Sequence, residues 1–138
     1  MKDAVTLRMA LPRIPDIELV ALEGLERLAL HLGISGGKIG EARILVTEAL
    51  INAFEHAGDK HPLVRVEFTM TPKELTIFVR DYGEGFEPSA VENTEAATQT
   101  RPMKTRGWGL KLMKSLSDGF RIQSGKSGTK ITITKLLS

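Results

Sequence analysis

The sequence predicts an α/β fold of the α+β kind: a two-layer sandwich in which helices cover one face of a mixed, mostly antiparallel sheet. Segments 64–70 and 75–81 alternate apolar and polar residues on either side of a short turn, which is typical of a half-buried hairpin. Segments 16–32 and 38–57 repeat apolar residues every three or four positions, as helices with one buried side do. We expect one domain that spans residues 1–138.

The remaining elements are less strongly patterned. A first strand is expected at 4–10, a third helix from about 107, and two final strands that begin near 120 and 131. Capping residues are expected at the helix ends, because the terminal backbone groups there need partners. They are Asp16 as an N-cap, and Gly33, Gly58 and Gly119 as residues that end the three helices.

Composition limits the function classes. The chain has no Cys, which excludes disulfides and thiolate metal sites, and no apolar run approaches the roughly 20 residues of a membrane helix. We therefore expect a cytoplasmic protein without a membrane partner. The formal net charge is only +2, and the densest basic stretch, 101–114, also carries glycines. That pattern favours a compact phosphate ligand over a nucleic-acid backbone, so no direct nucleic-acid partner is expected.

Residues 87–106 form a long polar stretch with little apolar periodicity. Long loops inside compact domains are usually functional or disordered. Because this one lies between two glycine motifs, we interpret it as a mobile lid over a nucleotide.

Glu48 and Asn52 stand four residues apart on the second predicted helix, so their side chains lie along one side of it. Magnesium prefers oxygen ligands and keeps several waters, so the oxygen of Asn52 is a sufficient protein ligand beside nucleotide phosphates. Glu48, one turn earlier, is a candidate general base. By itself, such a pair is more often an ordinary feature of a helix surface.

Asp81 ends a predicted strand and begins a glycine turn. A carboxylate there can accept a hydrogen bond from an adenine amino group, and Gly83 and Gly85 let the backbone approach a flat base. An ordinary turn explains the same residues equally well, since Asp and Gly favour turns.

Residues 106–110 open the third predicted helix. Exposed N–H groups at a helix N-terminus attract phosphate, and small residues there let it come close. Arg106 can add charge. Farther on, Thr129 is a candidate contact to the base or to a water beside Asp81, although a plain hairpin turn also fits. The candidate nucleotide contacts in these two segments are Arg106, Gly107, Gly109, Leu110 and Thr129.

Taken together, the motifs resemble those of the Bergerat-fold, histidine-kinase-like ATPases. Glu48 to Asn52 resembles the N box of that superfamily, and Asp81-x-Gly83-x-Gly85 and Gly107-x-Gly109 resemble its two glycine boxes. Within the superfamily, nearly the whole chain is similar to the bacterial anti-sigma-factor serine/threonine kinases.

The resemblance implies an activity and partners. Such a protein binds ATP and Mg²⁺, phosphorylates a Ser or Thr of a STAS-domain anti-anti-sigma protein, and sequesters a sigma factor. By the same resemblance, Asn52 holds the metal, Glu48 is the base, Asp81 reads adenine and Thr129 supports the adenine end. A homodimer through sheet edges near the first strand is also implied.

Two other functions fit the motifs. One is the ATP-binding module of a two-component histidine kinase. For that function, we would expect a phospho-acceptor helical hairpin to precede the module in the sequence. The other is a partner-switch binding protein without catalysis, a reading that the paired Glu48 and Asn52 weigh against.

Overall fold

The computed structural model describes residues 4–57, 63–83 and 105–138, with side chains from 108 onward in the last range. Helices and strands follow one another along the chain much as the sequence pattern indicates. The elements are β1 (Val5–Leu11), α1 (Glu18–Leu32), α2 (Gly37–His56), β2 (Val64–Met70), β3 (Glu74–Asp81), α4 (Thr105–Leu116), β4 (Gly119–Gly125) and β5 (Gly128–Leu136).

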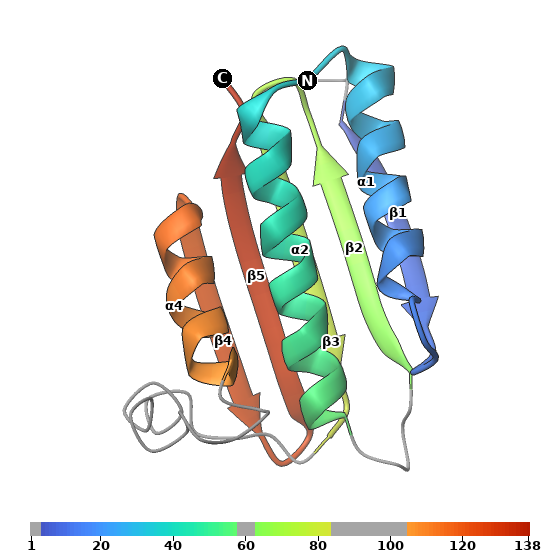
Figure 1. Ribbon diagram of the computed structural model, residues 1–138, viewed down its shortest axis with the longest axis vertical. Helices are drawn as coiled ribbons and strands as arrows, with labels where there is room; N and C mark the ends of the chain where they lie inside the picture. Colours follow the sequence, from blue (N-terminus) through green and yellow to red (C-terminus); the bar gives the residue numbers. More distant parts are fainter. Residues whose placement is uncertain (1–3, 58–62, 84–104) are drawn as a thin grey trace.

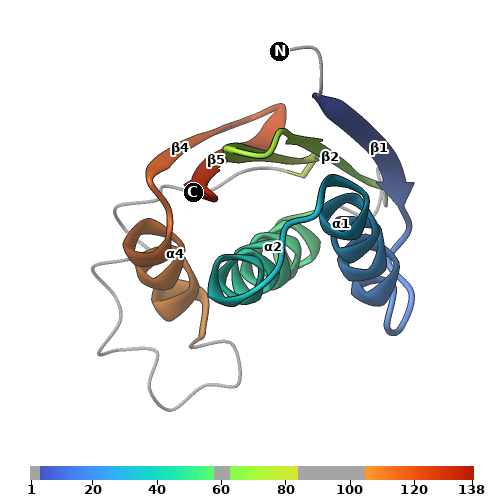
Figure 2. The same ribbon diagram turned by 90° about the horizontal axis from the view of Figure 1, so that it is seen from above.

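The strands form a five-stranded sheet in the order β1-β2-β3-β5-β4. All four pairings are antiparallel, so the described sheet is more uniform than the expected mixed one. Helices α1, α2 and α4 lie side by side on one face of the sheet, and none of the described helices lies on the other face (Figure 2). The predicted two-layer sandwich and the 64–81 hairpin are confirmed.

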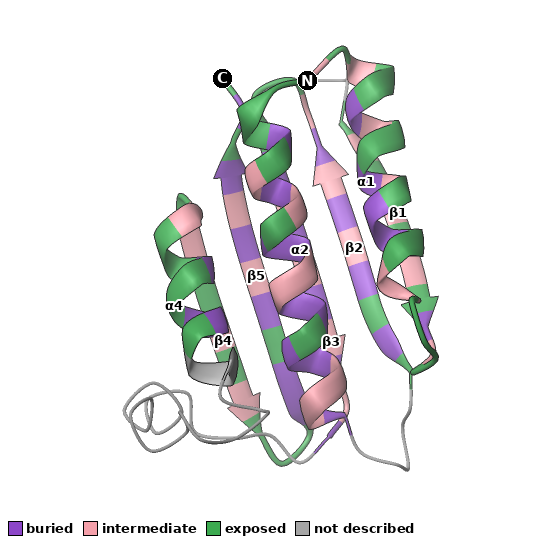
Figure 3. Cartoon of the chain, in the orientation of Figure 1, coloured by how far each residue is buried: buried purple, intermediate pink, exposed green. Residues whose placement is uncertain are grey.

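The core lies between the two layers. Period-two alternation in the strands turns Phe68, Ile77 and Ile133 toward the helices, where each is fully buried. The buried stripe of α2 comes from the helical repeat of Leu45, Ala49 and neighbouring residues. Figure 3 shows buried residues along α2 and along the middle strands that it overlies. The central helix is therefore held firmly over β3 and β5.

Several predicted helix ends are wrong in detail. Asp16 is not the N-cap of α1: it has φ 64°, its carbonyl accepts from Leu19 N, and Ile17 holds the cap position. Gly119 does not end α4, which stops at Leu116, but begins β4 instead. Gly58 lies outside the described residues. Gly33 does end α1, with the left-handed φ of 73° that favours glycine.

Among the described residues, no helix has the length and apolarity needed to cross a membrane.

Candidate nucleotide-binding site

The predicted site residues come from elements that meet at one end of the molecule. The C-terminal end of α2, the last residues of β3, the first residues of β5 and the start of α4 lie at the lower end in Figure 1. Antiparallel pairing of β3 with β5 places Asp81 directly opposite Thr129. The fold thus brings together motifs that are up to 81 positions apart in the sequence, from Glu48 to Thr129.

Asn52 projects from α2 into the protein. The residue is only 4% exposed, although a position on the helix surface was the ordinary alternative for it. The Oδ1 atom is buried and accepts no hydrogen bond from any described residue. A buried acceptor without a partner costs roughly 1–3 kcal/mol. Asn52 therefore presents an oxygen that a ligand can satisfy.

Glu48 lies one turn before Asn52 and faces α4. A Cβ on Gly109 would lie 2.8 Å from Glu48 Oε1, so the two helices approach each other through this carboxylate. Burial raises the pKa of Glu48, and the negative charge of Glu55 raises it further. A half-buried carboxylate with a raised pKa is suited to accept a proton near neutral pH.

Asp81 is almost fully buried, with 1% of its surface exposed. Its Oδ1 accepts a hydrogen bond from Gly83 N at 2.9 Å, whereas Oδ2 has no partner among the described residues. Burial raises the pKa of Asp81, and the Gly83 and Thr129 amides and the Arg80 charge oppose that rise. Asp81 thus has one oxygen fixed by its own turn and one left for a donor.

Thr129 is buried beside Asp81, and its Oγ1 shares a hydrogen bond with Ser124 Oγ at 2.8 Å. The preceding Gly128 has φ 115°, and a Cβ there would lie 2.2 Å from the Asp81 carbonyl oxygen. Only glycine allows β5 to come this close to β3 at the site. The sequence pattern did not predict this close approach.

The other predicted contacts are placed only in part. Gly109 is buried in the first turns of α4, and Leu110 is fully buried in the hydrophobic core. Trp108 is 57% exposed, so it lies outside the hydrophobic core. Arg106 and Gly107 belong to α4, but their side chains are outside the described residues, as are Gly85 and lid residues 87–104. Helix α4 begins at Thr105, inside the predicted lid boundary.

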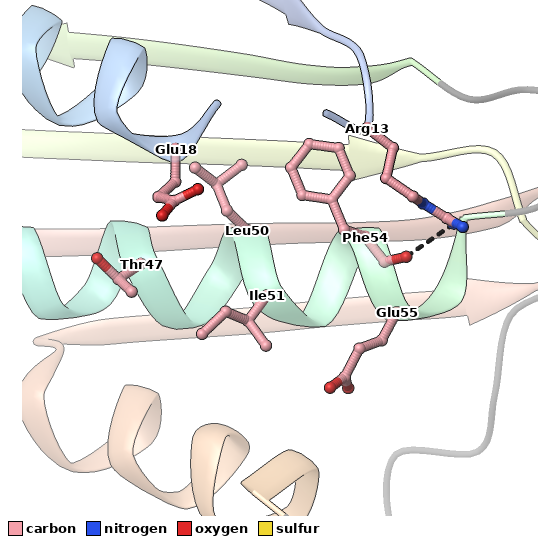
Figure 4. Close-up of a pocket in the computed structure, with 7 residues that line it drawn as sticks. All are labelled: Arg13, Glu18, Thr47, Leu50, Ile51, Phe54 and Glu55. Atoms are coloured by element: carbon pink, nitrogen blue, oxygen red, sulfur yellow. Dashed lines mark hydrogen bonds between the residues drawn. The ribbon is translucent and has the colours of Figure 1, made fainter. Parts of the chain in front are cut away.

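Arg13 is a positioning residue that sequence analysis missed. It lies between β1 and α1, and its Nη2 donates to the carbonyl oxygen of Phe54 at 2.8 Å (Figure 4). The same Nη2 donates to the carbonyl oxygen of Ala57 at 2.6 Å. A cation at a helix C-terminus satisfies its last carbonyls and favours its dipole. Arg13 therefore fixes the end of α2 that carries Asn52. No local pattern signals this, because the partners are more than 40 residues apart.

Arg13 also borders a hollow of about 480 Å³ between α1 and α2. Figure 4 shows Glu18 of α1 and Leu50 and Phe54 of α2 around it. None of the predicted nucleotide contacts lines this hollow. It is separate from the site at Asn52 and Asp81.

The donor set fits magnesium bound with phosphates better than a metal held by protein alone. Among residues 4–57, 63–83 and 105–138, no group of three His, Cys, Asp or Glu side chains could hold a metal ion. The buried Oδ1 of Asn52 is an oxygen ligand of the kind that Mg²⁺ accepts when waters and phosphate oxygens complete its shell.

Comparison with known proteins gives a consistent assignment. Residues 15–135 match the family described as the histidine kinase-like ATPase domain. The chain is 31% identical to the serine-protein kinase RsbW of Bacillus licheniformis, covering 96% of this chain and 86% of that one. It is 30% identical to the anti-sigma F factor of Clostridium novyi, covering 72% of each.

A solved structure shares the fold. The crystal structure of the RsbU and RsbW domains of Rv1364c from Mycobacterium tuberculosis superposes with a TM-score of 0.68 at 21% identity. The match covers 96% of this chain but 32% of that one. At this identity the likeness concerns the arrangement of helices and strands.

Proposed function

Because the chain belongs to the histidine kinase-like ATPase family, among its anti-sigma-factor serine kinases, we propose that it is an ATP-dependent anti-sigma kinase in a partner-switching system. In this proposal it phosphorylates a Ser or Thr of a STAS-domain anti-anti-sigma protein and sequesters a sigma factor. It acts in the cytoplasm as a homodimer. The edge position of β1 leaves a strand available for pairing with a second copy.

The observation that carries the proposal is a pair of buried oxygen atoms. Asn52 Oδ1 and Asp81 Oδ2 have no hydrogen-bond partner among the described residues. Folded proteins leave few buried polar atoms unsatisfied, and each exception needs an explanation. Mg²⁺ with its phosphates would satisfy Asn52, and the adenine amino group would satisfy Asp81. When bound, the metal neutralises phosphate charge.

The chain's own groups then position the reactants. The Gly83 amide orients the carboxylate of Asp81, which binds the adenine ring, and the start of α4 directs backbone N–H groups at the phosphates. The hydroxyl oxygen of the acceptor Ser or Thr attacks the γ-phosphoryl group, and ADP leaves. Glu48 accepts the proton of that hydroxyl. Phosphoryl transfer needs little covalent chemistry from the protein, so positioning of this kind supplies most of the rate.

Isothermal titration calorimetry with ATP, with and without Mg²⁺, tests the proposal. We expect magnesium-dependent binding in the micromolar range, lost in Asn52→Ala. A matched control is Thr47→Ala, which changes the same helix at a residue lining the separate hollow beside α1 and should bind normally. Normal magnesium-dependent binding by Asn52→Ala would overturn the metal assignment.

The product of phosphotransfer separates the alternatives. A phosphoserine or phosphothreonine survives acid, whereas the phosphohistidine formed by a histidine-kinase module does not. ATP binding without transfer to any STAS-domain protein would favour a partner-switch binding protein that lacks catalysis.

A further inference from the structure

The face of the sheet opposite helices α1, α2 and α4, which we call the open face, holds a row of cations. Arg65 of β2 pairs in register with Arg80 of β3, and Arg80 pairs with Lys130 of β5. All three side chains alternate away from the buried face, and neighbouring strands are about 4.8 Å apart. Like charges directly opposite each other destabilise a sheet. The fold thus keeps three cations side by side at a cost in stability.

In the neighbouring row of the same face, by contrast, a cation is paired with an acid. Arg8 of β1 is opposite Glu67 of β2, and Arg8 Nε lies 3.0 Å from Glu67 Oε2. The cationic row is completed by Ala10 on β1 and Gln123 on β4, so it contains no acid. Among the described residues, therefore, the row supplies no negative charge of its own, and a bound anion would balance its cations.

A hollow lies at one end of the row. It measures about 260 Å³ and is bordered by the β4–β5 hairpin and by the two cations Arg80 and Lys130. Gln123 and Ser127 add an amide and a hydroxyl to its wall. The lining therefore combines two positive charges with neutral hydrogen-bond donors, which is the composition that a tetrahedral oxyanion requires.

The guanidinium group of Arg80 stacks on an aromatic ring, and one of its N–H groups has no acceptor among the described residues. Its guanidinium carbon lies 4.6 Å from the centre of the Tyr82 ring, a cation–π arrangement that restricts the side chain. Its Nε is buried and has no hydrogen-bond partner among the described residues. An unsatisfied N–H on a fixed guanidinium is a preorganised donor for an oxyanion.

We propose that this hollow is a binding site for a phosphate group, which Arg80 and Lys130 hold on the open face of the sheet. A phosphate monoester carries about −1.5 to −2 charges at neutral pH, enough to neutralise more than one cation of the row. The site is distinct from the nucleotide site: Arg80 and Lys130 adjoin Asp81 and Thr129 in sequence, but alternate side chains point to opposite faces. The inference does not rest on the proposed function.

NMR titration of the full chain with inorganic phosphate tests the site. Sodium chloride at matched ionic strength serves as the reference. We expect a saturable shift of the Arg80 Nε–Hε signal and of the Ser127 and Gly128 amide signals. Arg80→Gln and Lys130→Gln should each weaken the affinity, measured on the hairpin amides, at least about tenfold, since a hydrogen bond to a charged group is worth roughly 1.5–3 kcal/mol.

Arg121→Gln is the matched control. Arg121 is an exposed cation of the same face, opposite Thr132 in the adjacent row, and does not border the hollow. It should leave the affinity unchanged, which separates a defined site from general attraction to a basic face. Preserved dispersion of the amide spectrum shows that each variant is folded.

A phosphoserine peptide, titrated in parallel, identifies the source of the phosphate. Arg65 lies in the row but not at the hollow. Arg65→Gln should weaken a peptide that extends along the row and leave free phosphate unaffected. Tighter binding of the peptide assigns the site to a phosphorylated partner, and equal or tighter binding of free phosphate assigns it to a small anion.

The proposal is overturned if neither probe moves the Arg80 signal saturably. It is also overturned if folded Arg80→Gln binds phosphate as tightly as the unsubstituted chain. Shifts confined to amides near Gly109 would mean that phosphate binds the candidate nucleotide site alone, and would refute the open-face site.

Discussion

The carboxylate of Glu48 occupies the space that a side chain at position 109 would need, since a Cβ on Gly109 would lie 2.8 Å from Glu48 Oε1. This contact joins the central helix to the start of α4, and it connects the candidate base to the segment that resembles a phosphate-binding turn. A glycine on one helix thereby determines where a carboxylate on another can lie.

Gly109→Ala should reduce phosphotransfer without reducing stability. The added methyl group displaces the flexible end of Glu48, which is easily accommodated, and alanine in a helix is favoured over glycine by up to about 1 kcal/mol. A displaced base, however, is expected to slow transfer by roughly tenfold to a hundredfold. Gly40→Ala in α2, where nothing lies within 4 Å, is the matched control and should keep full activity. Equal activities of the two variants would argue against this contact.

Glu48→Gln should retain ATP binding and lose phosphotransfer by about 10²–10⁴-fold. Burial and the charge of Glu55 raise the pKa of Glu48. As the pH is lowered, the wild-type rate should therefore begin to fall at a pH above that at which an ordinary glutamate becomes protonated. Glu55→Gln removes the neighbouring negative charge and should move that acidic limb to lower pH with the maximal rate retained. Rate profiles against pH for the three proteins check this, and an unmoved limb in Glu55→Gln would count against Glu48 as the titrating group.

Asp81→Asn should weaken the binding of adenine nucleotides. It should also change how the free energy of unfolding depends on pH. Burial raises the folded-state pKa of Asp81. A raised pKa means that the folded chain holds this proton more tightly, so stability is greatest below the unfolded pKa and falls as pH rises through the folded one. Urea unfolding of the ligand-free protein across acidic pH should show this decline, and the asparagine variant should lack that component. A decline of equal size in both proteins would assign it to other groups.

Gly128→Ala should be strongly destabilising. Its φ of 115° is unfavourable for other residues, and its Cβ would collide with the backbone of Asp81 and Tyr82 rather than with a movable side chain. Gly36→Ala isolates the first effect, because Gly36 has φ 94° and nothing within 4 Å. We expect Gly36→Ala to lower the free energy of unfolding by about 1–3 kcal/mol and Gly128→Ala to lower it by more. Equal losses in urea unfolding would mean that the close approach of β5 to Asp81 is unimportant.

Much of this architecture could be predicted from sequence, for a physical reason. Burial on one face imposes a period of two on β2 and β3 and a period of 3.6 on α2, so those elements are visible locally. The four-residue spacing of Glu48 and Asn52 likewise places them on one side of a helix. Partners from distant segments leave no such trace: Arg13 fixes the end of α2 from a loop, and the left-handed φ of Asp16 depends on the turn that precedes α1.

Lys135 is the clearest example of a residue whose partners are distant in sequence and cannot be predicted from a local pattern. It stands among the threonines and isoleucines of the last strand, yet it is 4% exposed. Its Nζ donates to Glu41 Oε1 of α2 and, at 2.6 Å, to the Leu116 carbonyl oxygen at the end of α4. One cation therefore joins β5 to two helices, and the carbonyls at the C-terminus of α4 favour that charge.

Glu41→Gln should destabilise the fold more than Lys135→Met does. The glutamine leaves a buried ammonium with a weaker partner, whereas methionine removes the charge and keeps most of the side-chain volume, so we expect it to stay within about 1 kcal/mol of wild type. The hydrogen bond and charge of Lys135 lower the pKa of Glu41. That contribution to stability is present above the unfolded pKa and lost as pH falls through the folded one. Urea unfolding at neutral and acidic pH should therefore show the gap between wild type and Glu41→Gln closing in acid. A gap that persists in acid, or a larger loss in Lys135→Met, would mean that the pair acts through packing rather than charge.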